Sequence, residues 1–289
     1  MRRAGSRPSA LALAVAAGLT ALAAGGCVAR LMVRSSLAPV EFDRLMIFYG
    51  HPLDLHLARP VQLQPGTPLL FYATGDGGWH GKDVDTYRRL IRWGYPVAGF
   101  SAPSYLSHLG FVSGTTTPAR LARDYREMIE FAKQTLSLPA DTRTILVGVS
   151  RGAGLAVVAA GRPELNVQLA GVLAVALTKE EEYVRHYKVV PGTSPSDMPT
   201  RELVEFKTYE YLYQLKDLPL VVIQSTNDWY LPASAARTLF GPDTAMRRLV
   251  SIKARDHSFN GARKELYAQM ADALAWMARM PPTQPAPPK

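Results

Sequence analysis

One serine in this 289-residue sequence lies in a setting that can make its hydroxyl a nucleophile. Ser150 is the central residue of the pentapeptide GVSRG, residues 148–152, which follows the apolar run 144–149 and precedes a small-residue run ending at 160. In a G-x-S-x-G turn between a strand and a helix, the serine is exposed at the end of the strand, and the glycines let the two elements pass closely. The pattern predicts a catalytic serine, and an ordinary helix N-cap is the alternative interpretation.

A serine hydroxyl needs a general base and an acid that orients it. Of the six histidines, only His257 follows the last predicted strand, in the segment DHSF at 256–259. Asp228 follows the apolar run 220–225 directly, and Asp256 is its best rival as the orienting acid. The resulting chain order, Ser150, Asp228 and His257, is the Ser-acid-His order of α/β-hydrolases.

Two backbone N–H groups are needed to stabilise the oxyanion that such a serine would generate. One should belong to Arg151, the residue after the nucleophile. The other should come from the glycine-rich segment TGDGGW at 74–79, where Asp76 or Gly77 is the expected donor. Neither G-x-G-x-x-G nor a P-loop lysine pattern occurs, and no His/Cys/Asp/Glu group has metal-ligand spacing, so we expect no metal and no cofactor.

The elements that would position these residues alternate along the chain. Apolar runs predict strands at 45–49, 53–58, 69–73, 96–101, 144–149, 169–177, 220–225 and 248–253. Periodic apolar positions predict helices at 84–91, 121–136, 152–160, 233–240 and 266–277. The first two strands should pair in an antiparallel manner, and the rest should form β-α-β units. We therefore expect an α/β-hydrolase fold, with a mostly parallel sheet, helices on both faces and an insertion after the sixth strand.

The insertion covers residues 178–216, where prolines and aromatic residues interrupt the alternation. It could act as a lid that contacts acyl chains, or its aromatic residues could simply pack. Its three consecutive glutamates, 180–182, could receive an ammonium group or form a solvated face, and Asp76 is the other candidate for an ammonium ligand. We expect the substrate to contact Trp79 of the glycine-rich segment and Glu181 and Tyr183 of the insertion. The predicted hydrolase domain spans 40–280, followed by a proline-rich tail at 281–289.

The first 27 residues have the pattern of an export leader. Three arginines precede an uncharged run, 8–29, that is rich in Ala and Leu. Residues 21–23 resemble an A-x-A cleavage site, whereas residues 23–27 resemble a loose lipoprotein box that ends at Cys27, the only cysteine. An uncleaved membrane anchor is the third alternative. The pattern favours an exported, periplasmic protein, lipidated at Cys27 and thereby attached to a membrane.

Composition and charge limit the possible partners. A hydrophobic content of 47% and a charged content of 20% are those of a globular chain. Without the three leader arginines, 30 basic residues face 24 acidic ones, a net charge of +6. No dense Lys/Arg tract supports nucleic-acid binding, so this charge suits an anionic membrane surface better.

Three segments together resemble a known family. TGDGGW at 74–79, GYPVAG at 94–99 and GVSRGA at 148–153 are similar to segments of the VirJ/AcvB bacterial virulence proteins, and the similarity spans residues 69–259. The chain departs from this pattern at Arg151, where many relatives carry Phe, and in an N-terminus shorter than that of two-lobed members. The resemblance implies an exported α/β-hydrolase that cleaves aminoacyl-phosphatidylglycerol into lipid and amino acid.

The sequence thus predicts a serine hydrolase with a lipid or small-molecule ester as substrate. Two other interpretations remain open. One is a periplasmic adaptor of an envelope or secretion system that has the hydrolase shape but no turnover, because the virulence relatives were named for a secretion phenotype. The other is an esterase or thioesterase of soluble substrates.

Overall fold

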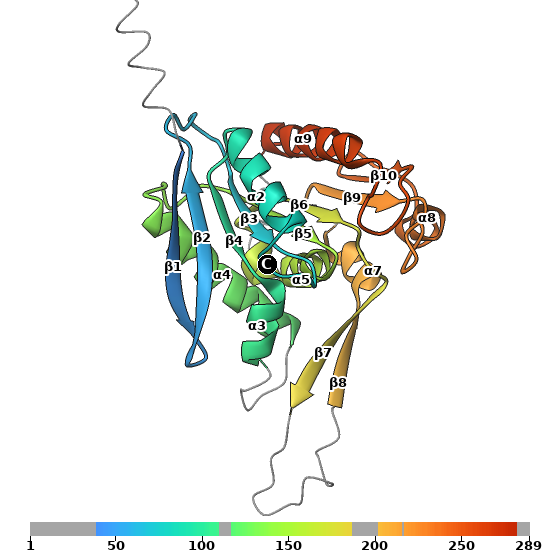
Figure 1. Cartoon of the computed structure of the whole chain (residues 1–289), viewed down its shortest axis with the longest axis horizontal. Helices are drawn as coiled ribbons and strands as arrows, with labels where there is room; N and C mark the ends of the chain where they lie inside the picture. The colour runs from blue at the N-terminus through green and yellow to red at the C-terminus, as the bar shows by residue number, and fades with distance from the viewer. Residues whose placement is uncertain (1–38, 110–116, 187–201, 216, 282–289) are drawn as a thin grey trace, which may run out of the picture. The chain divides into compact units, whose positions relative to one another are not determined.

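A single eight-stranded sheet forms the centre of the domain (Figure 1). The computed structural model describes residues 39–109, 117–186, 202–215 and 217–281. The strand order is β1-β2-β4-β3-β5-β6-β9-β10. The strands are β1 (Val40–Phe48), β2 (His51–Arg59), β3 (Leu69–Ala73), β4 (Val97–Phe100), β5 (Thr144–Val149), β6 (Leu169–Val175), β9 (Leu220–Ser225) and β10 (Arg247–Ile252). The helices that flank the sheet or connect its strands are α2 (Lys82–Arg92), α3 (Ala102–Leu109), α4 (Pro118–Thr135), α5 (Arg151–Ala160), α6 (Pro163–Asn166), α8 (Ala233–Phe240) and α9 (Arg263–Arg279).

The strand directions agree with the predicted fold class. β1 and β2 form an antiparallel hairpin, and β2 also runs antiparallel to β4. The hairpin turns at Tyr49 and Gly50, both at positive φ, as tight turns between twisted strands require. From β4 to β10 all neighbouring strands are parallel. The carboxyl ends of the parallel strands therefore meet at one edge of the sheet, where α/β proteins build their sites.

Both faces of the sheet are covered by helices, and alternate residues of each strand serve the two layers. In β3, Leu70 and Tyr72 belong to the core that α2 and α9 cover, whereas Phe71 belongs to the core formed with α4, α5 and α8. This alternation follows from the two-residue period of a strand. Because both faces are buried there, the inner strands β3, β4, β5 and β6 consist almost entirely of apolar residues, whereas β1, β2 and β10 include charged ones.

The boundary of α4 shows how local sequence sets an element. Thr117 is its N-cap and accepts a hydrogen bond from the backbone N–H of Arg120 at 3.2 Å, while Pro118 occupies the first helical position. A proline fits there because the first amides of a helix have no partner inside the helix. The helix predicted at 121–136 is confirmed, and it begins three residues earlier, at Pro118.

The insertion contains regular structure that the sequence did not predict. β7 (Glu180–His186) and β8 (Glu202–Lys207) pair in an antiparallel manner as a separate two-stranded sheet, followed by α7 (Thr208–Tyr211) and the 3₁₀ helix η2 (Leu212–Leu215). Figure 1 shows β7 and β8 extending away from the central sheet. α3 and α6 were not predicted either, because such short helices present no clear apolar stripe.

The expectations for the leader, Cys27 and residues 282–289 lie outside the described residues. Within the described part of the chain, no helix is both long and apolar enough to cross a bilayer.

Candidate active site

The turn between β5 and α5 holds Ser150 in a strained backbone conformation. Its φ is +51° and its ψ is −117°, a conformation that residues with a Cβ rarely adopt. The flanking glycines make the turn possible. A Cβ on Gly148 would lie 2.5 Å from the nitrogen of Ala153, and a Cβ on Gly152 would lie 2.5 Å from the carbonyl oxygen of Thr74. The spacing of the pentapeptide therefore reflects close backbone packing around the serine.

Three side chains from distant parts of the sequence meet at this turn. His257 lies in the loop after β10, and its Nε2 is 2.9 Å from the Oγ of Ser150. The Nδ1 of the same ring is 2.7 Å from Oδ2 of Asp228, in the loop after β9. The hydroxyl, imidazole and carboxylate thus form a continuous hydrogen-bonded series, the geometry that general-base activation of a serine requires.

Asp228 is held firmly in its orientation toward His257. Its side chain is fully buried. Oδ1 accepts the backbone N–H of Tyr230 at 2.9 Å, and Oδ2 accepts Nε2 of Gln224 at 3.0 Å as well as the imidazole. These donors compensate the buried charge and fix the carboxylate plane.

The rival acid, Asp256, is engaged elsewhere. Its carboxylate accepts the backbone N–H groups of Ser258 and Asn260 and the side-chain amide of Asn260, which is the pattern of a local loop cap. The structure therefore places Asp228, and not Asp256, against the imidazole.

The glycine-rich turn after β3, residues 74–79, lies beside Ser150, and we call it the oxyanion turn after its predicted role. A Cβ on Gly75 would be 3.6 Å from the Cβ of Ser150, and both Asp76 and Gly77 line the cavity in front of the serine. The backbone N–H of Ser150 itself donates to the carbonyl of Val175 at 2.8 Å. Arg151 is the first residue of α5, and its amide together with an amide of this turn stays the predicted pair of oxyanion donors.

The side chain of Arg151 joins the oxyanion turn to the insertion. Its guanidinium forms a two-point ion pair with the carboxylate of Asp76, and its Nη1 is 3.3 Å from Glu181 in β7. Glu181 is only 5% exposed and accepts the hydroxyl of Thr178. Burial raises the pKa of Glu181, although Thr178 and Arg151 act in the opposite direction.

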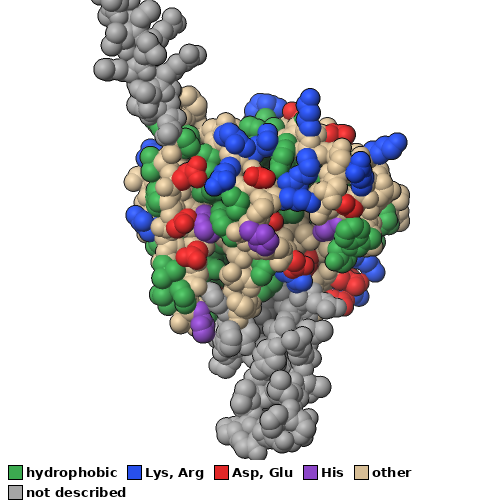
Figure 2. All heavy atoms as spheres, viewed as in Figure 1, with side chains coloured by type: hydrophobic (Ala, Val, Ile, Leu, Met, Phe, Trp, Pro, Cys, Tyr) green, Lys and Arg blue, Asp and Glu red, His purple; other side chains and the backbone are tan. Residues whose placement is uncertain are grey.

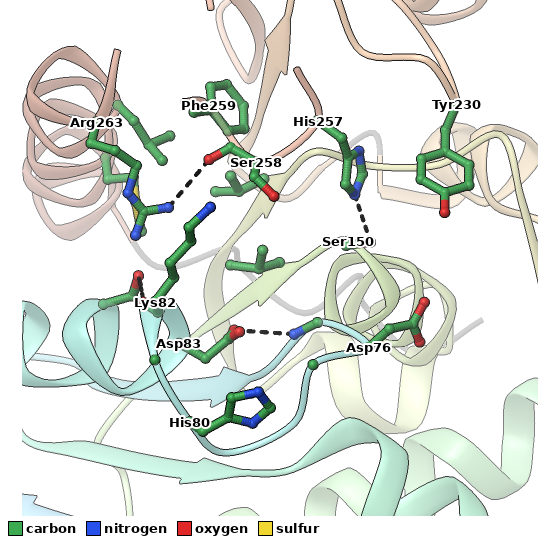
Figure 3. A pocket seen from close by; sticks show the side chains of 18 of the residues that line it. Asp76, His80, Lys82, Asp83, Ser150, Tyr230, His257, Ser258, Phe259 and Arg263 are labelled. Carbon is green, nitrogen blue, oxygen red and sulfur yellow. Dashed lines mark hydrogen bonds between the residues drawn. The ribbon is translucent and has the colours of Figure 1, made fainter. Parts of the chain in front are cut away.

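A cavity of about 460 Å³ opens in front of the serine (Figure 3). Apolar side chains from the sheet and from α9 form part of its wall, among them Val149, Val175, Leu266 and Met270. Its polar lining comes from the segment 75–83 and from residues near His257. A largely apolar cavity with a few polar groups beside a nucleophile is typical of a small-molecule site.

Asp83 is a half-buried acid of this cavity. Its Oδ1 accepts the hydroxyl of Tyr72 at 2.6 Å and the backbone N–H of Gly75 at 3.1 Å, so it braces the oxyanion turn against β3. Burial raises the pKa of Asp83 despite these two hydrogen bonds.

Two of the residues predicted to contact the substrate do not line the cavity. Trp79 does not line the cavity. Its ring stacks on His56 at 3.7 Å between centroids and fills the space beside Gly99. Glu181 is also absent from the lining, because it is buried beneath Arg151 and against Gly154. The side chain of Tyr183 lies outside the described residues.

Several lining residues escaped the sequence reasoning. Tyr230 packs edge-on against His257 with ring centroids 4.9 Å apart, and its position two residues after Asp228 could have indicated this. Lys82, Asp83 and Arg263 also line the cavity. Lys82 and Asp83 follow the glycine-rich turn closely, whereas nothing in the sequence around Arg263 distinguishes it from an ordinary helix start. In the described ranges, no three His, Cys, Asp or Glu side chains are grouped so that they could hold a metal ion.

Comparison with known proteins agrees with the geometry. Residues 68–188 match the family described as bacterial virulence protein (VirJ). This segment includes the oxyanion turn, the serine turn and the start of the insertion. Residues 68–188 therefore belong to the VirJ family. None of the curated proteins matches the chain.

Solved structures extend the likeness beyond the VirJ segment. Est1E from Butyrivibrio proteoclasticus has a TM-score of 0.57 at 12% identity, covering 82% of this chain and 99% of its own. An alpha-beta serine hydrolase homologue from Coxiella burnetii has a TM-score of 0.55 at 15% identity, with coverages of 80% and 96%. S-formylglutathione hydrolase FrmB from Staphylococcus aureus has a TM-score of 0.54 at 11% identity, with coverages of 84% and 98%. The VirJ segment is thus part of an α/β-hydrolase fold that this chain shares with serine esterases.

Proposed function

We propose that this VirJ-family protein is a serine hydrolase that cleaves a carboxylic ester. The observation that supports this most strongly is the hydrogen-bonded series from Asp228 through His257 to Ser150, at the mouth of a cavity. A buried carboxylate on one ring nitrogen and a serine in a strained turn on the other are together typical of a catalytic histidine and not of a structural one.

The reaction follows from the positions of these groups. Nε2 of His257 accepts the hydroxyl proton while Oγ of Ser150 bonds to the ester carbonyl carbon. The carbonyl oxygen becomes an oxyanion and accepts hydrogen bonds from the amide of Arg151 and from that of Asp76 or Gly77. The alcohol leaves with the proton from His257, and an acyl-enzyme remains.

Water completes the cycle. His257 accepts a proton from the water as its oxygen attacks the acyl carbon. The second oxyanion collapses, the acid departs, and the proton returns to Ser150. Asp228 stays ionised throughout, holds the ring in the required tautomer and stabilises the imidazolium. Apart from the attacking water, residues of this chain supply every group that these reaction steps need.

We propose aminoacyl-phosphatidylglycerol at the periplasmic membrane face as the substrate. The family resemblance implies this lipid, and the surface charge supports a membrane partner. Figure 2 shows Lys and Arg side chains gathered on the upper part of one face, where α2 and α9 lie in Figure 1. A basic face of this kind is attracted to anionic lipid headgroups. Export and lipidation at Cys27 would hold the protein at the membrane.

The test is to incubate the purified protein with vesicles containing lysyl- or alanyl-phosphatidylglycerol and to identify the lipids by mass spectrometry. We expect release of phosphatidylglycerol and free amino acid. Ser150→Ala should keep the thermal unfolding profile of the native protein but lose both lipid turnover and labelling by a fluorophosphonate. Retention of turnover and labelling by this variant would remove Ser150 from the mechanism.

The same variant separates the alternatives. Cleavage of soluble esters or thioesters with no turnover of the lipid would favour an esterase of soluble substrates. If a deletion strain regains the wild-type phenotype when it expresses Ser150→Ala at normal protein levels, the protein acts as an adaptor and not as an enzyme.

A further inference from the structure

Two cationic side chains line the Ser150 cavity on the side away from Asp76 (Figure 3). Lys82 is the first residue of α2, and Arg263 is the first residue of α9. These two helices cover the same face of the sheet, so residues 181 positions apart in the sequence reach one cavity.

Neutral groups hold both side chains in place. Nζ of Lys82 donates to the side-chain oxygen of Asn260 at 3.0 Å. The guanidinium of Arg263 donates to the carbonyl of Ser258 at 3.4 Å and to the hydroxyl of Tyr267 at 2.6 Å. Neither cation forms an ion pair with a carboxylate of the described residues. These hydrogen bonds to neutral groups therefore orient the two side chains, and in the part of the chain that the structure describes no carboxylate in direct contact neutralises their charges.

The acidic groups of the cavity are committed to other contacts. Asp76 is ion-paired with Arg151, and Asp83 is hydrogen-bonded to Tyr72 and to the backbone of the oxyanion turn. Arg263 acts on Asp83 at longer range and favours its ionised form, but burial opposes that ionisation and dominates. Asp256, which does not line the cavity, acts on Lys82 at longer range, and its carboxylate is already hydrogen-bonded to Ser258 and Asn260. The lining at this end of the cavity thus carries two cations and one half-buried carboxylate. Such an arrangement attracts an anion.

We propose that Lys82 and Arg263 form a subsite for a phosphate group in the substrate whose ester reacts at Ser150. The inference rests on the proposed ester hydrolysis and adds which side chains of the cavity bind the phosphate beside the ester. A guanidinium with an adjacent ammonium is a common phosphate-binding pair, because both donate charge-assisted hydrogen bonds. The apolar wall formed by Val149, Leu266 and Met270 lies in the same cavity and suits a short carbon linker between the ester and the phosphate.

Either a lipid phosphodiester or a soluble phosphate ester carries this chemistry. The surrounding surface favours the lipid. Arg88 and Arg92 on α2 and Lys264 on α9 are exposed on the helices that carry the two cavity cations. A phosphate bound between Lys82 and Arg263 would therefore lie beside a surface that attracts anionic headgroups.

Three alanyl esters with the same acyl group test the subsite. Alanyl-glycerol is neutral, alanyl-glycerol 3-phosphate is soluble and anionic, and alanyl-phosphatidylglycerol is presented in vesicles. The readout is kcat/KM for the native protein and for Lys82→Met and Arg263→Gln. Arg88→Gln and Lys264→Met serve as matched controls, since each removes one exposed charge from the same helix.

We expect each cavity variant to lower kcat/KM for the two phosphorylated esters about tenfold more than for alanyl-glycerol, mainly through KM, as loss of one charge-assisted contact predicts. The controls should keep the native ratio between the two soluble esters. Arg263→Lys should retain most of the preference, because it keeps the charge. Equal losses on neutral and phosphorylated esters, or the same change of ratio in the controls, would overturn the proposal.

A binding measurement separates this inference from the hydrolase proposal. Calorimetry with glycerol 3-phosphate is carried out on Ser150→Ala and on the same variant with Lys82→Met added. If no ester is turned over but binding occurs and depends on Lys82, the hydrolase proposal fails and the subsite stands. If esters are cleaved with no preference for phosphate, the subsite alone fails. A larger loss on the vesicle substrate than on the soluble phosphate ester assigns the site to lipid, and equal losses assign it to phosphate esters in general.

Discussion

Replacing Gly152 by alanine tests whether close backbone packing positions the oxyanion turn. The added Cβ would lie 2.5 Å from the carbonyl oxygen of Thr74 and 2.6 Å from the carbonyl carbon of Ala73. Both are backbone atoms, so no side-chain rotation relieves the overlap. Ordinary van der Waals contact requires the turn after β3 and the start of α5 to separate by about 1 Å.

Both stability and activity should respond to that separation. Overpacking of this kind costs about 2 kcal/mol, or roughly 6 °C in Tm for a domain of this size. The turn that moves is the one that carries Asp76 and Gly77, so the predicted oxyanion donor is displaced relative to Ser150. A misplacement of about 1 Å in a catalytic group lowers kcat on the order of 100-fold.

Gly161→Ala is the matched control. It lies at the other end of α5, at φ −63°, and its added Cβ would approach the terminal oxygen of Gln214, a side chain that can move away. Calorimetric unfolding and turnover of a soluble ester are measured for both variants. The reasoning is refuted if Gly152→Ala unfolds at the native temperature and keeps full turnover, or if Gly161→Ala is equally impaired.

Two further predictions concern carboxylates near the serine. Asp228→Asn should keep the fold but lower kcat by about 10³- to 10⁴-fold, because a neutral amide neither selects the required imidazole tautomer nor stabilises the imidazolium. Ester turnover measured across pH checks this prediction. A loss of kcat of less than tenfold would contradict it. Glu181→Gln should become more stable relative to the native protein as the pH rises. Burial raises the pKa of Glu181, so its stabilising contribution is complete below the ordinary Glu pKa and is lost as the pH rises through the folded-state pKa. Thermal unfolding of both proteins from pH 4 to pH 8 measures the difference, and a difference that shrinks with rising pH would show that the ion pair with Arg151 outweighs burial.

Much of the fold was open to prediction from local sequence. Apolar runs of strand length alternating with periodic helical segments indicated the parallel sheet, because its inner strands are buried on both faces and are therefore apolar along their length. The main departures were short elements, such as α3 and the β7–β8 hairpin, whose formation depends on what they pack against.

The contact of Ser150, Asp228 and His257 could also be foreseen, since each follows a predicted strand and the carboxyl ends of parallel strands share one edge. Their catalytic roles remain predictions. The serine turn was recognisable in the local sequence because close backbone packing allows only glycine at positions 148 and 152.

The surroundings of the serine were decided only by the tertiary structure. Trp79 and Glu181 looked like substrate ligands in the sequence, yet one packs beside Gly99 and the other is buried beneath Arg151. Lys82 and Arg263 line the cavity although nothing near Arg263 in the sequence indicated it. The physical reason is that a side chain's role depends on which distant element it faces, and the packing of α2 and α9 on one sheet face determines this only when the whole chain has folded.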